Sequence, residues 1–215
     1  MARGASDLAE AVADRSAART VARRKEVYRA EVQRILDATY RLIARDGVVD
    51  PPLRDILRES GLSIQAFYKH FQSKDELMLV LLDDGRRRLV GYLEHRMAKA
   101  TDPAGRIRAW IEGVLAQAAD PEVAARTRPF LTHQDRLAEQ FPAEQRQSVG
   151  LLVELLAESI QALPGRRRAG AGRDAQAVYE VAFGTLHRHL SHGSRPGRAE
   201  VEHVVRFSLQ GIGAS

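Results

Sequence analysis

The 215-residue sequence contains no cysteine and no long hydrophobic run. The lack of cysteine excludes disulfide bonds, thiol nucleophiles and thiolate metal sites, and it is compatible with a reducing compartment. The longest apolar stretches are short and interrupted by charges, and the N-terminus lacks the apolar segment of a secretory signal. We therefore expect neither membrane insertion nor export, and we expect a cytoplasmic location.

Acidic residues are absent from the stretch Ser63–Lys74, which belongs to a basic N-terminal part of the chain. Residues 1–74 hold 14 Lys/Arg against 10 Asp/Glu, whereas the charges of the remaining residues nearly cancel. Lys69, His70 and Lys74 lie together in the acid-free stretch. The net charge of +5 is thus concentrated, and this concentration favours an acidic partner.

The sequence also shows no strand-like alternation and no internal repeat. Apolar residues recur at intervals of three and four, and glycine and proline separate the periodic stretches. The pattern predicts an all-α protein of about nine helices in two domains. We expect a flexible basic arm over residues 1–24, a small helical domain over 25–75 and a larger helical domain over 76–215. Within the larger domain, the later helical stretches are predicted near 103–119, 121–138, 142–163, 173–192 and 197–213.

Three helices are predicted in the small domain, of which the second and third are short. The first begins near Lys25 and stops at Gly47, and the second follows Asp50, which we expect to cap it, and ends at Gly61. Ser63 can cap the third helix, whose inward face is provided by phenylalanines at 67 and 71. A helix, a tight turn and a second helix with a polar outer face form the layout of a helix-turn-helix. Spacing alone does not separate this reading from three ordinary packed helices.

The residues of this region carry a more specific signal. They include Arg54-Asp55-Ile56 in the second helix, Gly61-Leu62-Ser63 at the turn, and Phe67-Tyr68-Lys69-His70-Phe71 followed by Ser73-Lys74-Asp75-Glu76-Leu77. With these features the run from Ile35 to Leu77 resembles the DNA-binding domain of the TetR (tetracycline repressor-like) family. The resemblance implies a sequence-specific transcriptional regulator, typically a repressor, that binds double-stranded DNA at a palindromic operator.

The resemblance, together with side-chain chemistry, nominates a set of DNA-binding residues. It implies phosphate contacts for Tyr68 and Lys74, while Gln65 can read adenine and Arg54 can read guanine. The full set is Arg54, Ser63, Ile64, Gln65, Ala66, Tyr68, Lys69, His70 and Lys74. Solvated surface positions remain the alternative for Arg54 and Gln65, and half-buried packing remains the alternative for Tyr68.

The family also implies a homodimer and a small-molecule effector of unknown identity that releases DNA. For the dimer interface we expect the last two helices, with intramolecular packing as the alternative; the candidates are Val178, Val181, Thr185, Leu186, Leu190, Val201, Val204, Val205, Leu209 and Ile212. For the effector pocket, with core packing as the alternative, the candidates are Trp110, Phe130, His133, Phe141 and Phe183.

Other functions find less support in the sequence. No nucleophile elbow and no metalloprotease motif is present, so we expect no catalytic residues, no enzymatic activity and no cofactor. The histidines at 187, 189, 192 and 203 lack the spacing that places two ligands on one helix face, and we expect no metal site. The remaining alternative is a helical interaction protein or ligand-binding protein without specific DNA binding.

Overall fold

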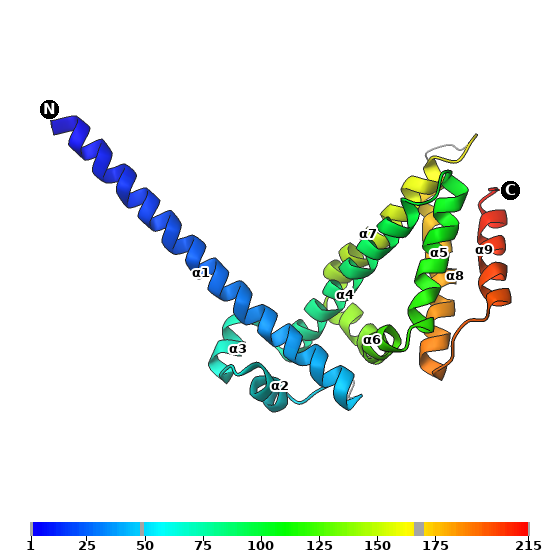
Figure 1. The fold of residues 1–215 in the computed structure, drawn as a ribbon, viewed down its shortest axis with the longest axis horizontal. Coiled ribbons are helices and arrows are strands. Elements are labelled where there is room, and N and C mark those ends of the chain that lie inside the picture. Colours follow the sequence, from blue (N-terminus) through cyan, green and yellow to red (C-terminus); the bar gives the residue numbers. More distant parts are fainter. Residues whose placement is uncertain (1, 48–49, 166–169, 215) are drawn as a thin grey trace. The chain divides into compact units, whose positions relative to one another are not determined.

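The computed structural model describes residues 2–47, 50–165 and 170–214, with the backbone alone for residues 2–13, 129, 130 and 132–134. These described residues form nine helices and no strand (Figure 1), so the predicted all-α class is confirmed. They divide into two compact units. The first unit runs to Leu42 and resumes over Pro51–Lys74, and the second contains Ile43–Asp50 and the chain from Asp75 onward.

The first unit is built from three helices, α1 (Ala2–Asp46), α2 (Leu53–Ser60) and α3 (Ile64–His70). Helices α2 and α3 lie where the sequence predicts them. Helix α1 begins at Ala2, well before the predicted start near Lys25. Alanine and arginine dominate the added segment, and both favour helix even where no apolar face is available for burial.

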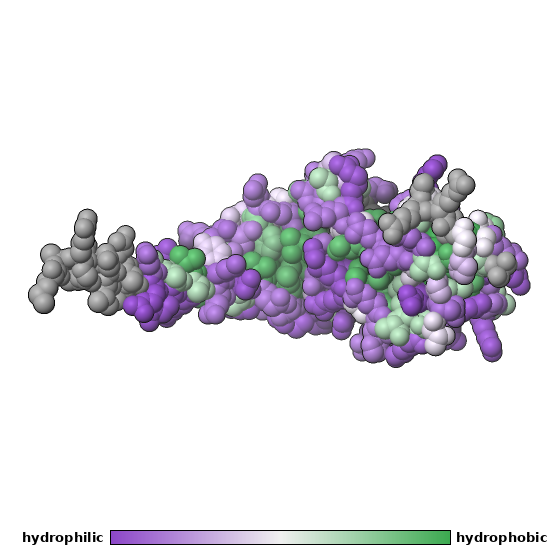
Figure 2. Space-filling model, turned by 90° about the horizontal axis from the view of Figure 1, so that it is seen from above, coloured by the Kyte–Doolittle hydropathy of each residue, from purple (hydrophilic) through white to green (hydrophobic). Residues whose placement is uncertain are grey.

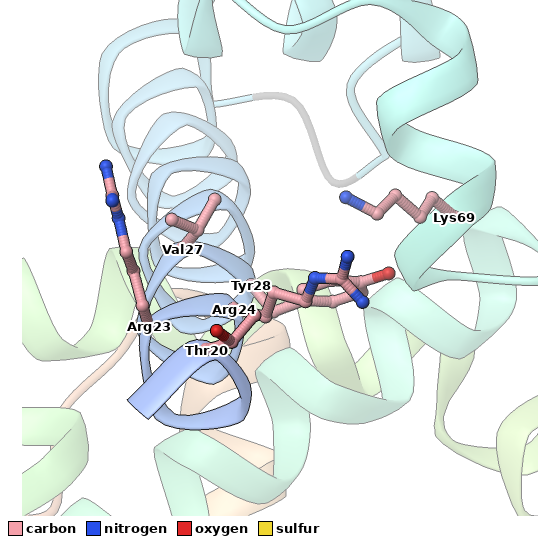
Figure 3. A pocket seen from close by; sticks show the side chains of 6 residues that line it. All are labelled: Thr20, Arg23, Arg24, Val27, Tyr28 and Lys69. Carbon is pink, nitrogen blue, oxygen red and sulfur yellow. The ribbon is translucent and has the colours of Figure 1, made fainter. Parts of the chain in front are cut away.

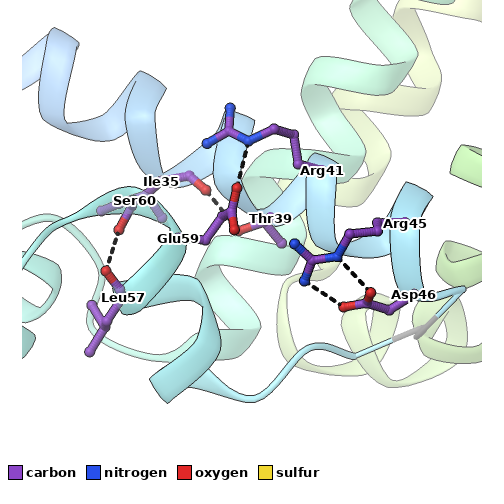
Figure 4. Close-up of polar contacts among 8 residues, drawn as sticks. All are labelled: Ile35, Thr39, Arg41, Arg45, Asp46, Leu57, Glu59 and Ser60. Carbon is purple, nitrogen blue, oxygen red and sulfur yellow. Dashed lines mark hydrogen bonds and ion pairs between the residues drawn. The ribbon is translucent and has the colours of Figure 1, made fainter.

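A small apolar core holds the first unit together. Its two aromatic members, Phe67 and Phe71, lie 5.4 Å apart between ring centroids. The buried apolar side chains are Ile35, Leu36, Ala38, Leu42, Ile56, Phe67 and Phe71. Polar contacts complete the packing (Figure 4): Arg41 Nε donates to Glu59 Oε1 at 2.9 Å, joining α1 to α2. The buried hydroxyl of Thr39 donates to the Ile35 carbonyl at 2.8 Å, so it needs no other partner.

The turn between α2 and α3 depends on a glycine. Gly61 has φ +65°, a left-handed conformation that costs a side-chain-bearing residue about 1 kcal/mol, and its N–H bonds to the Leu57 carbonyl. Arg34 of α1 donates to the carbonyls of Ser60 at 2.6 Å and Gly61 at 3.3 Å. A Cβ at position 61 would lie 3.1 Å from the Arg34 Nη2 atom, so a side chain there would also require the Arg34 guanidinium to shift slightly.

The start of α2 corrects one expectation. The residue that precedes the helix is Pro52, and no side chain caps it. Asp50 was expected at the position before the helix, but the helix begins at Leu53 and Pro52 occupies that position.

The second unit contains α4 (Lys74–Met97), α5 (Pro103–Ala119), α6 (Pro121–Gln140), α7 (Pro142–Gln161), α8 (Ala171–His192) and α9 (Arg198–Gly211). The last five agree closely with the stretches predicted from the sequence. Proline stands at the first position of α5, α6 and α7, where its missing N–H costs nothing. Asp102 and Asp120 cap α5 and α6 by accepting backbone N–H groups at 2.8–3.1 Å.

The core of the second unit lies where α8 packs against α5 and α7. Trp110 is its largest fully buried side chain. Gly113 of α5 allows a close approach to α4, because a Cβ there would lie 2.6 Å from Leu93 Cδ2. A large side chain at position 110 and the absence of one at position 113 thus help to set how closely the helices of this unit pack.

Several residues predicted for the dimer interface instead belong to this core. Six are buried within the chain itself: Val178, Leu186, Leu190, Val204, Val205 and Ile212. The alternative of intramolecular packing is correct for these six, because α8 and α9 use their apolar stripes against α5 and α7. Helix α9 still exposes Phe207, whose surface is 57% accessible.

Much of the molecular face seen in Figure 2 is hydrophilic, with hydrophobic side chains showing between the polar ones. In the residues that the structure describes, no helix combines the length and apolar character needed to span a bilayer.

Candidate functional site

Helix α3 begins where its sequence provides a cap. The Ser63 hydroxyl accepts the N–H of Ala66 at 3.1 Å, as predicted, and the backbone of Ser63 is extended. The ring of Phe67 is fully buried and that of Phe71 nearly so, which orients the helix. One face of α3 is therefore fixed inward and the opposite face is available for contacts.

The outward face of α3 presents three different chemistries. Tyr68 is 56% exposed and offers a hydroxyl and a ring edge, while Ile64 is 53% exposed and apolar. Gln65 is exposed and offers an amide, and the next residue, Ala66, is half-buried. A short helix with an amide, a phenol and small apolar groups can contact both base edges and phosphates.

The structure places His70 differently from its outward neighbours. Its side chain is only 2% exposed, and Nε2 lies 2.6 Å from Glu31 Oε2 of α1. Its ring also meets the Tyr28 ring edge-on at 5.0 Å. The last turn of α3 faces α1, so the imidazole fastens the two helices together and is not presented outward.

Lys69 lies beside this contact but remains accessible. Its Nζ is 4.0 Å from the centre of the Tyr28 ring and 3.5 Å from Glu31 Oε2. The hydrogen bond with His70 lowers the pKa of Glu31, and the charge of Lys69 lowers it further. Partial desolvation acts in the opposite direction, but the pKa remains below its usual value. Glu31 therefore stays ionised at neutral pH and positions both α3 residues.

Arg54 and Lys74 complete the residues predicted to contact DNA. The Arg54 side chain is 84% exposed, and its Nε lies 3.6 Å from Asp55 Oδ1, a contact too loose to restrain the guanidinium. Lys74 is half-buried at the first position of α4. A lysine at a helix start lies beside free backbone N–H groups that also favour phosphate.

A second candidate region lies in the core of the second unit. Of the predicted effector residues, the structure brings two together: the Trp110 and Phe183 rings lie 6.3 Å apart, and Tyr179 stacks on Phe183 at 4.3 Å. Phe141 is half-buried between α6 and α7. The side chains of Phe130 and His133 lie outside those that the structure describes.

Sequence reasoning missed the most informative residue of this region, Arg86. Arg86 is buried on α4, and its Nη1 donates to Gln145 Oε1 of α7 at 2.6 Å. No carboxylate in the described part of the chain pairs with it. Buried Gln145 Nε2 and Trp110 Nε1 have no hydrogen-bond partner among the described residues. Unpaired buried donors are costly, so the region has unused capacity for acceptors.

The charge state of this region follows from burial. Burial, with the nearby charge of Arg86, lowers the pKa of His187, and burial raises the pKa of Tyr179. Burial also lowers the pKa of Arg86, but an arginine stays protonated at neutral pH. At neutral pH Arg86 is therefore the cation among these three groups, while His187 and Tyr179 are uncharged.

A signal for Arg86 is present in the sequence. In the stretch Asp83-Asp84-Gly85-Arg86-Arg87-Arg88, two arginines find an aspartate four residues earlier, Arg87 with Asp83 and Arg88 with Asp84. The residue four before Arg86 is Leu82, so Arg86 lies on the apolar side of the helix. Helical phase therefore distinguishes Arg86 from its neighbours.

The histidines of the C-terminal part have structural contacts. Both ring nitrogens of His189 are engaged, Nδ1 with Ser194 Oγ at 2.8 Å and Nε2 with Glu200 Oε2 at 2.9 Å. His192 Nδ1 lies 2.7 Å from the Arg188 carbonyl. Among the described residues, no group of three or more histidine and acidic side chains is arranged to hold a metal ion.

Comparison with known proteins agrees with the geometry of α2 and α3. A sequence model described as "Bacterial regulatory proteins, tetR family" matches residues 35–81, which include both helices and the turn. The chain carries a tetR-family domain. The fold and this TetR domain are those of DNA-binding transcriptional regulators, in agreement with the resemblance noted between Ile35 and Leu77. The search of curated proteins found no match.

Solved structures extend the similarity of fold beyond the TetR domain. A TetR transcription regulator from Haloarcula marismortui is 20% identical, with 86% of this chain and 97% of that one covered and a TM-score of 0.64. FadR from Bacillus subtilis, in complex with stearoyl-CoA, is 13% identical, covering 84% and 96%, with a TM-score of 0.59. RolR in complex with resorcinol is 13% identical, covering 89% and 91%, with a TM-score of 0.65. The larger helical unit thus shares its fold with that of TetR regulators.

Proposed function

We propose that this protein is a cytoplasmic, homodimeric transcriptional repressor that binds a palindromic operator and is released from it by a small molecule. The observation that carries the proposal is the outward face of α3, where Gln65, Tyr68 and Lys69 are exposed on a helix capped by Ser63. This face belongs to the region that matches the tetR family.

In this proposal each exposed residue has a role set by its chemistry. Gln65 reads an adenine, because its amide offers one donor and one acceptor to the N6/N7 edge, and Arg54 reads a guanine, because its guanidinium offers two donors to O6 and N7. Tyr68, Lys69 and Lys74 contact phosphates, and Ile64 and Ala66 offer apolar contact to thymine methyl groups. Ser63 contributes through the backbone at the helix start. His70, whose ring is turned toward Glu31, contributes by orienting α3.

Two copies of the chain are needed for specific binding. A single α3 reaches few phosphates and bases, which gives weak and strongly salt-dependent affinity. A two-fold dimer presents two such helices to successive turns of a near-palindromic duplex. The exposed Phe207 on α9 supplies an apolar position for such an interface.

The salt dependence of DNA binding tests the proposal. We expect a duplex from the upstream region of the protein's own gene to be bound more tightly than random duplex, with affinity falling steeply as salt rises. Lys74→Ala should weaken binding to all duplexes and reduce the salt slope by about one unit per bound head. Fluorescence anisotropy at several salt concentrations measures both quantities.

Lys99→Ala is the matched control, because Lys99 is an exposed lysine of the second unit and its loss changes the net charge equally. It should leave affinity and slope unchanged. If Lys74→Ala behaves like this control, the phosphate role of Lys74 is wrong. If the wild-type chain shows no preference over random duplex, the alternative of a helical interaction protein without specific DNA binding is favoured.

The buried cluster around Arg86 supports an effector with an acidic group. A buried guanidinium without a carboxylate partner among the described residues can accept an anion, and the free N–H groups of Gln145 and Trp110 can donate to it. The rings of Tyr179 and Phe183 offer apolar and aromatic contact. Resorcinol and stearoyl-CoA in two structures of the same fold support a small organic ligand in general.

Arg86→Met should greatly reduce the response to such acids. We expect carboxylic acids, tested beside the corresponding neutral alcohols, to raise the melting temperature of the wild type. Loss of the charged hydrogen bond, worth about 1.5–3 kcal/mol, should weaken acid binding about 10- to 150-fold. Arg87→Met is the control, since Arg87 is exposed and paired with Asp83. Equal acid responses of Arg86→Met and wild type would exclude Arg86 as the anchor.

A further inference from the structure

A shallow basic groove lies on the first unit, between α1 and the end of α3 (Figure 3). It has a volume of about 470 Å³ and is open to solvent. Its lining consists of Thr20, Arg23, Arg24, Val27, Tyr28 and Lys69. Five of these come from α1, and Lys69 alone comes from α3, so the groove continues the surface that carries Tyr68 and Gln65.

Charge makes the groove complementary to an anion. Three of its six lining residues are cations and none is acidic. The same holds along α1, where residues 15–25 contain five Lys/Arg and no Asp/Glu. Neither Arg23 nor Arg24 forms an ion pair with another described residue. Their guanidinium groups are therefore available to a partner.

The exposure of α1 indicates that the partner is a separate molecule. Residues 14–30 are exposed on all sides of the helix in the part of the chain that the structure describes. Val27 and Tyr28 are nevertheless large, exposed and apolar, and they line the groove. A helical segment with no buried face of its own gains stability when another molecule covers it.

Lys69 connects the groove to the DNA-facing residues. Its Nζ is held over the Tyr28 ring at 4.0 Å, so the lysine of α3 and the aromatic residue of α1 form one surface. The next residue back along α3 is Tyr68, which points outward. Whatever lies against the outer face of α3 will meet the groove if it extends past Lys69.

We propose that this groove binds the sugar-phosphate backbone of the DNA that flanks the site contacted by α3. The proposal rests on the DNA-binding function above and adds Arg23, Arg24 and Tyr28 to the interface. Guanidinium forks match phosphate oxygens in pairs, and the side chain of Tyr28 can lie against a sugar. From Arg15 to Tyr28 the helix rises about 20 Å, enough to follow roughly six base pairs of flanking duplex.

The test compares two duplexes and two double variants. One duplex is the shortest that the wild type binds specifically, and the other extends it by ten base pairs of random sequence on each side. Wild type should bind the extended duplex about tenfold more tightly at low salt. Arg23→Ala/Arg24→Ala should lose this gain, keep its affinity for the short duplex, and lower the salt slope on the long one by about two units per head.

Lys25→Ala/Arg29→Ala is the matched control, because both residues belong to the same exposed helix segment, do not line the groove and carry the same total charge. It should retain most of the gain. Equal loss in the two double variants, or no loss in either, overturns the proposal. The proposal is also overturned if the wild type binds the extended duplex no more tightly than the short one.

Two further outcomes separate this proposal from others. If the wild type prefers no duplex at all, both the DNA-binding function and the groove assignment fail, whereas failure of the groove alone leaves short-duplex binding intact. If Arg23→Ala/Arg24→Ala instead loses binding to phosphatidylglycerol vesicles with no change on either duplex, the groove faces a lipid surface and the DNA assignment is wrong. Circular dichroism checks that α1 remains helical in each variant.

Discussion

Tyr68→Ala is expected to weaken specific DNA binding about 30- to 1,000-fold while leaving the fold intact. The side chain is 56% exposed on the outer face of α3, where its hydroxyl and ring can contact DNA. Each such contact is worth roughly 1–2 kcal/mol, and the dimer loses two, so the total is about 2–4 kcal/mol. Anisotropy titrations with operator duplex measure the effect.

Two variants show which part of Tyr68 matters. Tyr68→Phe keeps the ring and should lose only the share of affinity that the hydroxyl provides. Tyr92→Ala removes an exposed tyrosine from α4 and should leave DNA affinity unchanged. If Tyr68→Ala binds operator as tightly as wild type, α3 does not present this face to DNA. The observation on which the repressor proposal rests would then be contradicted.

Trp110→Ala is expected to destabilise the second unit by about 3–5 kcal/mol, which corresponds to a fall in melting temperature of roughly 6–20 °C. The indole is fully buried, and rings from α8 lie against it at 6.3 and 6.5 Å. Removing it leaves a cavity that these helices cannot fill without moving. Differential scanning calorimetry measures the loss.

The size of that loss separates two roles for Trp110. A core residue costs several kcal/mol when truncated, whereas a residue that lines an open pocket costs far less. Trp110→Phe keeps most of the volume and removes the unpaired Nε1 donor, so it should cost only about 1–2 kcal/mol. An unchanged melting temperature for Trp110→Ala would contradict the buried position and favour pocket lining.

Helix boundaries were predicted well where local chemistry determines them. Asp102-Pro103 and Asp120-Pro121 place a capping carboxylate before a proline, and α5 and α6 begin at these prolines. The turn before α3 was equally predictable, because Gly61 supplies the left-handed residue and Ser63 the next cap. In each case one or two adjacent residues decide the outcome.

Positions that depend on distant partners were not predictable in the same way. His70 follows two outward residues, yet its ring turns inward because Glu31, far back on α1, provides its partner. The apolar stripes of α8 and α9 were assigned to a dimer interface, but α5 and α7 cover much of them within the chain. A periodic pattern shows that a face is buried, and it does not show what buries it.

Arg86 lies between these two cases. Its helical phase against Leu82, Asp83 and Asp84 indicates an inward position, and this can be read from the sequence. Its partner Gln145 lies 59 residues later and is known only from the fold. The candidate effector region therefore needed the structure, whereas most of the candidate DNA-binding face did not.

Gly61 links the two halves of the proposed DNA interface. The Arg34 guanidinium, which a side chain at position 61 would displace slightly, also holds the turn to α1 by donating to two backbone carbonyls. The glycine thus affects how α3 is held against α1, because the Arg34 contact acts on the turn that leads into α3. We therefore expect position 65, where the side chain is exposed, to tolerate substitution more readily than position 61, where φ is +65°.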